Sequence, residues 1–438
     1  MIRHTDNNAM NTLLSKKQID SGARNVFLLC VLAYTAIYIG RKNFSVCLSA
    51  MLDENFIDKI AGGSAGTAFL IIYAVGQAVS GIISDRISPK HMITIGLCGA
   101  GCANLLMAVN RFPALVTAIW CLCGAFCSML WASIIKCIAE WLPEDRIEKA
   151  GVNISITVPL GSVITYVIAS GAMKLAGWRE VFAICGSICI ISGMIFRLSV
   201  AHLSPYIAFI ADSKTTVEIT GKKNGNKTAA KEKRLFAAMI SVSMLLIIAS
   251  VLCNGALKDG LDFWTPTFIS EFFGISASVS AILMSFIPIL NVAGAHFANF
   301  FFRFGLDEMS VTGIMYLFAA GAFIPLCLIT YYGSSSAPLM YLSIALLAII
   351  MLATTGANTA LMTFIPLRYK NSGITSGISG ILNAFSYAGA ACSGIIGGFI
   401  SQNNGWFTVI LTFAAISMLG ALVSFAGIHT WKKRRQSL

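Results

Sequence analysis

The chain has 438 residues, of which 57% are hydrophobic and only 11% are charged, and its mean hydropathy is +0.78. These values exclude an ordinary soluble globular protein and are typical of a protein that crosses a membrane many times. The net charge of +12 would suggest a nucleic-acid partner in a soluble protein. Here most Lys and Arg residues fall on alternate loops and at the termini, so the charge indicates membrane topology and no nucleic-acid partner is expected.

The chain contains twelve apolar runs that are long enough to cross a bilayer as helices. In chain order they cover about residues 26–51, 62–83, 92–109, 114–138, 150–173, 178–200, 243–268, 279–302, 311–331, 339–365, 373–400 and 406–428. The sequence predicts an all-α membrane protein with two pseudo-symmetric six-helix bundles. Lys and Arg gather on every second loop and at both termini, and basic loops lie on the cytoplasmic side of a membrane. We therefore expect a multi-pass protein of the cell membrane with both termini in the cytoplasm.

The runs divide the chain into five parts. We expect a cytoplasmic N-terminal segment over residues 1–25, an N-terminal bundle over 26–203, a cytoplasmic linker over 204–234, a C-terminal bundle over 235–428 and a basic cytoplasmic tail over 429–438. The linker is polar and rich in Lys, Gly and Asn, which favours a flexible cytoplasmic loop whose lysines follow the positive-inside pattern. Binding of these lysines to the head groups of anionic membrane lipid is the alternative. The dipeptide Gly-Trp opens the last run of each half, at residues 177–178 and 405–406, which indicates an internal repeat.

The first run contains the stretch YTAIYIGRKNFS, from Tyr34 to Ser45, in which Arg41 and Lys42 interrupt an apolar helix. A cation at that depth costs roughly 2.5–3.5 kcal/mol on insertion scales, so something must offset it. Tyr34, Tyr38 and Arg41 follow one another at offsets of four and three, which places them on one helix face. The pattern favours a water-filled cavity that holds an anion, although the two cations would also suit the end of a shorter span.

The seventh run carries a second buried cation, Lys258, at about the depth of Arg41. Asp259 and Asp262 follow it, and Asp262 is four residues on, so we expect it to pair with Lys258 until an anionic substrate competes for the lysine. Asn254 lies one turn before Lys258 and is a candidate hydrogen-bond donor. Two other interpretations stay open: the pair only neutralises the helix, or the segment is an outer loop.

The eleventh run is rich in Gly and places Asn383 and Tyr387 four residues apart, where both can face a central cavity. Asp259 and Asp262 are the only carboxylates well inside the runs, so a carboxylate proton relay is disfavoured unless it uses these two. The cysteines lie in apolar runs without metal-ligand spacing, and no common catalytic motif occurs. We therefore expect no enzyme, no metal and no cofactor.

The strings IYIGRKNF, GIISDRISPK, LKDGLDFWTPTF and NSGITSGISGILNAFSYAGAACSGIIGG resemble the organophosphate:phosphate antiporter family of the major facilitator superfamily. The resemblance covers essentially the whole chain and implies the major facilitator fold. In that family an arginine in each of the first and seventh helices binds the phosphate group, and transport proceeds by rocking of the two halves. The resemblance implies that Arg41, its neighbour Lys42 and the tyrosines Tyr34, Tyr38 and Tyr387 contact the substrate.

The chain departs from that family at three positions. The seventh-helix arginine is replaced by Lys258, which keeps the charge but lacks the planar fork suited to two phosphate oxygens. A second-helix lysine of well-known members is Gln77 here, and a fifth-helix histidine is Pro159.

We therefore expect an antiporter that exchanges a phosphorylated organic anion, of the sugar-phosphate or glycerol-phosphate type, for inorganic phosphate by a rocker-switch mechanism, and that works as a monomer. The expected substrate-binding residues are Arg41, Lys42, Lys258, Tyr34, Tyr38, Asn254 and Tyr387, and the expected gating or charge-pairing residues are Asp259, Asp262, Asp85 and Arg86. Two alternatives remain: a proton-coupled transporter of a non-phosphorylated organic anion, and a sugar-phosphate sensor that signals to a membrane partner.

Overall fold

A computed structural model of the chain describes residues 15–84, 87–218, 239–333, 335–369, 372 and 374–436. Within these ranges the chain is helical with short connections and contains no strand. Twelve helical segments are long and apolar enough to cross a membrane. Each corresponds to one of the twelve predicted runs, and the largest differences are the earlier start of the first segment and the later end of the twelfth. The predicted all-α membrane fold is therefore confirmed, and the protein is an integral, multi-pass membrane protein.

The N-terminal half consists of α1 (Lys16–Asp53), α2 (Lys59–Ser84), α3 (Pro89–Val109), η1 (Pro113–Leu115), α4 (Val116–Trp141), α5 (Glu144–Asn153), η2 (Ile154–Ile156), α6 (Thr157–Leu175), α7 (Trp178–His202) and α8 (Ser204–Glu218). The C-terminal half consists of α10 (Val242–Gly255), η3 (Ala256–Gly260), α11 (Leu261–Phe273), α12 (Ala277–Met284), α13 (Phe286–Phe302), α14 (Glu308–Tyr332), α15 (Ala337–Thr359), η4 (Ala360–Phe364), α16 (Ile365–Arg368), α17 (Thr375–Asn403) and α18 (Gly405–Gln436).

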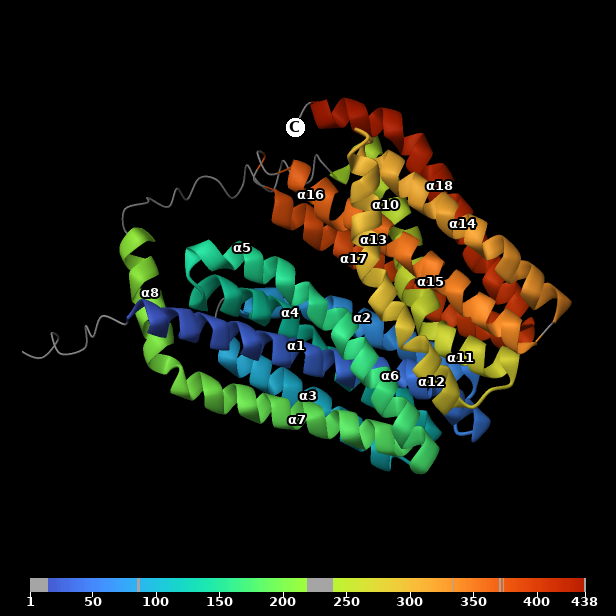
Figure 1. Cartoon of the computed structure of the whole chain (residues 1–438), viewed down its shortest axis with the longest axis horizontal. Helices are drawn as coiled ribbons and strands as arrows, with labels where there is room; N and C mark the ends of the chain where they lie inside the picture. Colours follow the sequence, from blue (N-terminus) through green and yellow to red (C-terminus); the bar gives the residue numbers. More distant parts are fainter. Residues whose placement is uncertain are drawn as a thin grey trace, which may run out of the picture.

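The two halves repeat one packing scheme, and Figure 1 shows them as a blue-to-green body and a yellow-to-red body. In the first half α3 packs against α4 and α7, and α1 packs against α6 and α7. In the second half α14 packs against α15 and α18, and α10 packs against α17 and α18. The halves meet through α2 against α17 and through α6 against α12 and α13. These two interfaces are equivalent under the repeat, so the predicted pseudo-symmetry is confirmed.

Polar contacts between the halves lie mainly toward the end of the molecule where α1 finishes, which we call the far end; the other end, where α1 begins, is the terminal end. At the far end Lys59 forms an ion pair with Glu271, with 2.6 Å between Nζ and Oε2. The Ile60 N–H donates to Gln402 Oε1 over 3.1 Å, and the Ser278 hydroxyl donates to the Ser170 carbonyl over 2.7 Å. The far end is therefore fastened between the halves in this structure.

The repeated Gly-Trp dipeptide has a structural cause in both halves. Gly177 and Gly405 have φ of 109° and 76°, values that favour glycine, and each turns the chain into the last helix of its half. The indole of Trp178 then donates to Glu54 over 2.9 Å, and that of Trp406 donates to Glu271 over 2.9 Å. In each half the motif therefore ties the last membrane span to the end of the first span.

The seventh and tenth spans are not continuous α-helices. Each contains a π-helical segment, η3 (Ala256–Gly260) and η4 (Ala360–Phe364), and each has a proline further along, Pro266 and Pro366. A π segment widens the turn and changes which side chains share a face, and such segments are frequent at functional sites. Because η3 contains Lys258, its irregular geometry bears directly on the candidate site.

Three predicted non-spanning segments are more helical than expected. Helix α1 begins at Lys16, capped by Ser15, and α8 occupies residues 204–218 of the predicted flexible linker, where the Tyr206 hydroxyl donates to the Trp141 carbonyl over 3.0 Å. Helix α18 continues to Gln436 through the predicted tail. The rest of the linker lies outside the described residues, so the limits of the predicted domains stay a prediction.

A buried acidic residue explains why α18 extends. Glu308, at the start of α14, is fully buried and accepts a hydrogen bond from the Trp431 indole over 2.8 Å and another from Arg368 Nε over 2.6 Å. Asp307 beside it lies 3.5 Å from the amine of Lys432. The basic end of the chain is thus bound to the C-terminal half as a helix, because α14 presents carboxylates to it.

Glycine allows α10 to approach α17 very closely. A Cβ atom built on Gly255 would lie 1.8 Å from the Ser386 carbonyl oxygen, and that oxygen belongs to the backbone of α17. We expect Gly255→Ala to cost about 1–3 kcal/mol of stability, as overpacking does elsewhere. The measurement is the midpoint of thermal unfolding of the purified protein in detergent, which should fall.

The matched control is Gly321→Ala in α14, where an added Cβ meets nothing within 4 Å. That substitution should hold or raise the midpoint, since Ala is the better helix former by about 1 kcal/mol. Equal midpoints for the two variants would contradict the close approach of α10 and α17.

Candidate functional site

Arg41 lies well inside α1 and is surrounded by aromatic rings. Its guanidinium carbon is 4.5 Å from the ring centre of Tyr73, 5.1 Å from that of Tyr38 and 5.6 Å from that of Phe69. These distances are those of cation–π contacts, which stabilise a buried cation without using its N–H groups. Among the ion pairs of the described residues none involves Arg41, so its donors remain available to an anion.

A polar network from both halves surrounds this arginine. The Gln77 amide donates to the Tyr73 hydroxyl over 2.8 Å, and the Asn383 amide of α17 donates to Gln77 Oε1 over 3.1 Å. The rings of Tyr73 and Tyr387 pack edge to face with centres 5.1 Å apart. The structure therefore brings the predicted Tyr387 and Asn383 to the Arg41 region, together with two residues of α2.

Sequence reasoning missed Tyr73. It named Gln77 only as a departure from a family pattern, and a tyrosine in an apolar run gives no signal of its own. The four-residue spacing from Tyr73 to Gln77 does place both on one face of α2. That spacing was the available signal, and it becomes informative only once α2 is known to face α1 and α17.

Lys42 and Lys258 each have a carboxylate partner, unlike Arg41. Lys42 of α1 forms an ion pair with Asp262 of α11, which joins the two halves. Lys258 forms an ion pair with its neighbour Asp259, with 2.9 Å between Nζ and Oδ1. All four side chains keep some exposure, from 20% to 32%, so neither pair is fully enclosed.

The predicted pair between Lys258 and Asp262 does not form. The expectation assumed an α-helix, in which residues four apart share a face. Lys258 lies instead in the π segment η3, whose wider turn changes that relation. Asp262 is already in α11 and faces α1, so it pairs with Lys42, while Lys258 takes the adjacent Asp259.

Two predicted substrate-binding residues are enclosed in this structure. Tyr34 is only 6% exposed, and its ring packs against Trp131, with centres 5.2 Å apart, and against Tyr38. Asn254 is fully buried and donates to Asn358 Oδ1 over 3.1 Å, while its own Oδ1 has no partner among the described residues. Tyr34 and Asn254 therefore support the wall of the site here.

Asp85 and Arg86, predicted as charge-pairing residues, lie outside the described residues. Within the described part of the chain no group of three or more His, Cys, Asp or Glu side chains is arranged to hold a metal ion.

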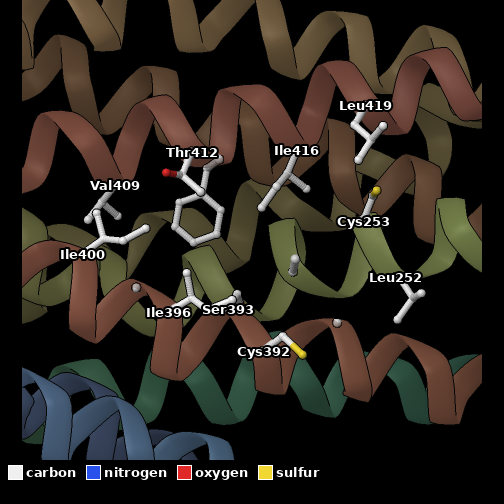
Figure 2. Close-up of a pocket in the computed structure, with 14 residues that line it drawn as sticks. Leu252, Cys253, Cys392, Ser393, Ile396, Ile400, Val409, Thr412, Ile416 and Leu419 are labelled. Carbon is white, nitrogen blue, oxygen red and sulfur yellow. The ribbon is translucent and has the colours of Figure 1, made fainter.

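A separate pocket of about 310 Å³ lies behind η3, between α10, α17 and α18. Figure 2 shows its mainly aliphatic wall, with Thr412 and Ile416 on α18, Cys392 on α17 and Cys253 on α10. None of its lining residues is charged. Its hydroxyl groups, on Ser393 and Thr412, donate to carbonyls of their own helices. Because an anion needs free donors or cations, this pocket is unsuited to a phosphorylated substrate, and the charged residues of α1 and η3 remain the candidate site.

Three proteins of known or assigned role are similar to the chain over long stretches. It is 23% identical to a probable hexose phosphate transport protein of Chlamydia trachomatis, over 97% of this chain and 94% of that protein. It is 23% identical to the glycerol-3-phosphate transporter of Bacillus subtilis, over 90% of each. The membrane sensor protein UhpC of Escherichia coli is 23% identical over 62% of this chain and 63% of that protein.

Solved structures share the fold at lower identity. A bacterial homologue of the human lysosomal transporter Spinster, in an inward-facing and unoccupied conformation, has a TM-score of 0.75 and 15% identity over 96% of this chain and 99% of that chain. The sequence pattern of the Major Facilitator Superfamily matches residues 30–388. The relatives confirm the resemblance to organophosphate:phosphate antiporters, and the chain belongs to the major facilitator superfamily.

Proposed function

We propose that the protein exchanges a phosphorylated organic anion, of the sugar-phosphate or glycerol-phosphate type, for inorganic phosphate. The main support for the proposal is the environment of Arg41. This cation lies inside a membrane-spanning helix, has aromatic neighbours and has no carboxylate partner among the described residues. A phosphoryl group supplies the missing negative charge. The named roles of the similar proteins, hexose phosphate and glycerol-3-phosphate transport, support this substrate class.

The residues around Arg41 suit a phosphoryl group for chemical reasons. A guanidinium presents parallel N–H donors that fit two phosphate oxygens at once. The hydroxyls of Tyr38, Tyr73 and Tyr387 supply further hydrogen bonds, and Lys258 approaches from the other half. On binding, the phosphate oxygens compete with Asp259 and Asp262 for the two lysines.

Exchange, as opposed to one-way transport, follows from the same charges. An empty site leaves Arg41 without an anion, and moving an uncompensated cation through an occluded state is costly in a low-dielectric interior. A bound anion removes that cost. The return step therefore favours a site that holds an anion. Inorganic phosphate can be that anion, because it has the same phosphoryl group as the substrate and lacks only the organic part.

The ion pair between Lys42 and Asp262 links binding to movement of the halves. It crosses from α1 to α11, so an anion that draws Lys42 away from Asp262 weakens the contact between the halves. We propose that the terminal end faces the cytoplasm at the cell membrane and that this structure, fastened at its far end by Lys59 and Glu271, is the inward-facing state of a rocker switch. The site is complete within one chain, which supports function as a monomer.

A sensor of sugar phosphates is the second candidate, favoured by the similarity to the membrane sensor protein UhpC. The same site would then bind the anion without sustained flux. Exchange of labelled phosphate in proteoliposomes separates the two candidates, because a sensor binds phosphate esters and shows no appreciable exchange.

Substitution of Arg41 tests the proposed exchange directly. We expect Arg41→Gln to lower phosphate exchange in proteoliposomes by about 100-fold or more, since two charge-assisted hydrogen bonds contribute about 1.5–3 kcal/mol each. Arg41→Lys should fall between that variant and the parent, because it keeps the charge and loses the fork. Arg197→Gln, at an exposed position of α7, is the control and should exchange at the parental rate. Parental exchange by Arg41→Gln would refute the assignment.

The ion pair between the halves can be tested by a double-mutant cycle. Lys42→Gln and Asp262→Asn should each lower the thermal midpoint in detergent, because each leaves one charge in the interior without its partner. The double variant should lose less than the sum, with a coupling of about 0.5–3 kcal/mol. The pair Lys136 and Glu140, 3.7 Å apart on α4, is the control, with an expected coupling of about 0.3–0.5 kcal/mol. Additive effects at Lys42 and Asp262 would show that the pair does not act as a unit.

A further inference from the structure

The charges of the candidate site do not balance a doubly charged phosphate. Three cations, Arg41, Lys42 and Lys258, meet two carboxylates, Asp259 and Asp262, and both carboxylates form ion pairs with lysines. The described residues of the site therefore carry one net positive charge. The groups act on one another as one cluster, because Asp259 lies within range of the charges on Lys258, Lys42 and Arg41, and Lys258 within range of Asp259, Tyr38 and Asp262.

We propose that Asp259 is a specificity-determining residue that sets the charge of the transported anion to one. This inference rests on the proposed function and deepens it, since it names the charge class of the substrate. By neutralising Lys258, Asp259 leaves the charge of Arg41 to be matched by a singly charged phosphoryl group, which makes the loaded site neutral. A dianion binds only together with a proton, and that protonated complex has the same net charge.

Asp259 is better suited to this role than Asp262. Asp262 pairs with Lys42 across the two halves, so it also affects how the halves fit together. Asp259 pairs with its own neighbour in η3, and that pair leaves the contact between the halves unchanged. Removing the Asp259 carboxylate therefore changes the charge of the site with little direct effect on its conformation.

Sulfate is the appropriate probe, because it has the tetrahedral shape of phosphate and stays doubly charged over the pH range in which a phosphate monoester loses its second proton, near pH 6. The measurement is binding of a labelled phosphate monoester to the purified protein, with unlabelled sulfate as competitor. The parent should discriminate against sulfate, and its affinity for the ester should fall as the pH rises through about 6.

The decisive comparison uses charge variants. Asp259→Asn raises the net charge of the site by one, so sulfate should compete about tenfold more strongly or better, the size of effect that one nearby charge has on an ionic equilibrium. The double variant Lys258→Gln with Asp259→Asn restores one net charge and should regain the parental discrimination. Asp145→Asn, at an exposed side chain of α5, is the matched control and should behave as the parent does.

Each outcome decides the proposal. Unchanged sulfate competition in Asp259→Asn overturns it, and so does equal competition in the single and double variants, which would indicate a local steric effect. If Asp259→Asn does not fold, Lys258→Gln lowers the net charge to zero and should weaken sulfate competition further; stronger competition would overturn the proposal.

If the parent binds no phosphate ester, the proposed function fails. If Arg41→Gln abolishes binding while Asp259→Asn changes nothing, only this inference fails.

Discussion

The structure depends on one electrostatic constraint: charges inside a membrane-spanning bundle need compensation. The cations of the candidate site obtain it either from carboxylate partners or from aromatic rings. Lys42 and Lys258 have carboxylates as partners. Arg41 has the faces of Tyr73, Tyr38 and Phe69, which stabilise a cation but do not neutralise it. In the proposed function this remaining positive charge is what binds the anion, and that role would explain why an arginine is present in an otherwise apolar helix.

Because the two halves repeat one architecture, the need to compensate buried charges also links the halves to each other. Because α1 and the α10–η3–α11 span occupy equivalent positions in the two bundles, their charged residues meet at the centre. The pair between Lys42 and Asp262 crosses that boundary, whereas the pair between Lys258 and Asp259 lies within one span. Under the proposed function, the first pair would therefore respond to the arrangement of the halves, and the second to the charge of the bound anion.

The fold and the identity of the buried cations could be predicted from the sequence, because hydrophobic length and the cost of charge in lipid act locally. The twelve spans, the repeat and the positions of Arg41, Lys42 and Lys258 required no tertiary information. The partners could not be predicted in the same way. Pairing of Lys258 with Asp262 follows from an α-helix, and the π segment η3 has no sequence signature beyond a following proline. Likewise the helical end of α18 depends on Glu308, which lies far away in the sequence.

The choice of lysine at position 258 becomes understandable in this setting. An arginine there would hold its carboxylate through a planar fork, and the same fork would be needed for the phosphoryl oxygens. A lysine amine carries rotatable donors on a flexible stem, so it exchanges one oxygen partner for another without a large change in geometry. In the proposed transport cycle Lys258 is never left unpaired. Asp259, its neighbour in η3, holds it when the site is empty, and a phosphoryl oxygen would replace or join the carboxylate when the site is loaded. In this proposal only Arg41 makes a bidentate contact, so Arg41 recognises the shape of the phosphoryl group and Lys258 adjusts the charge of the site.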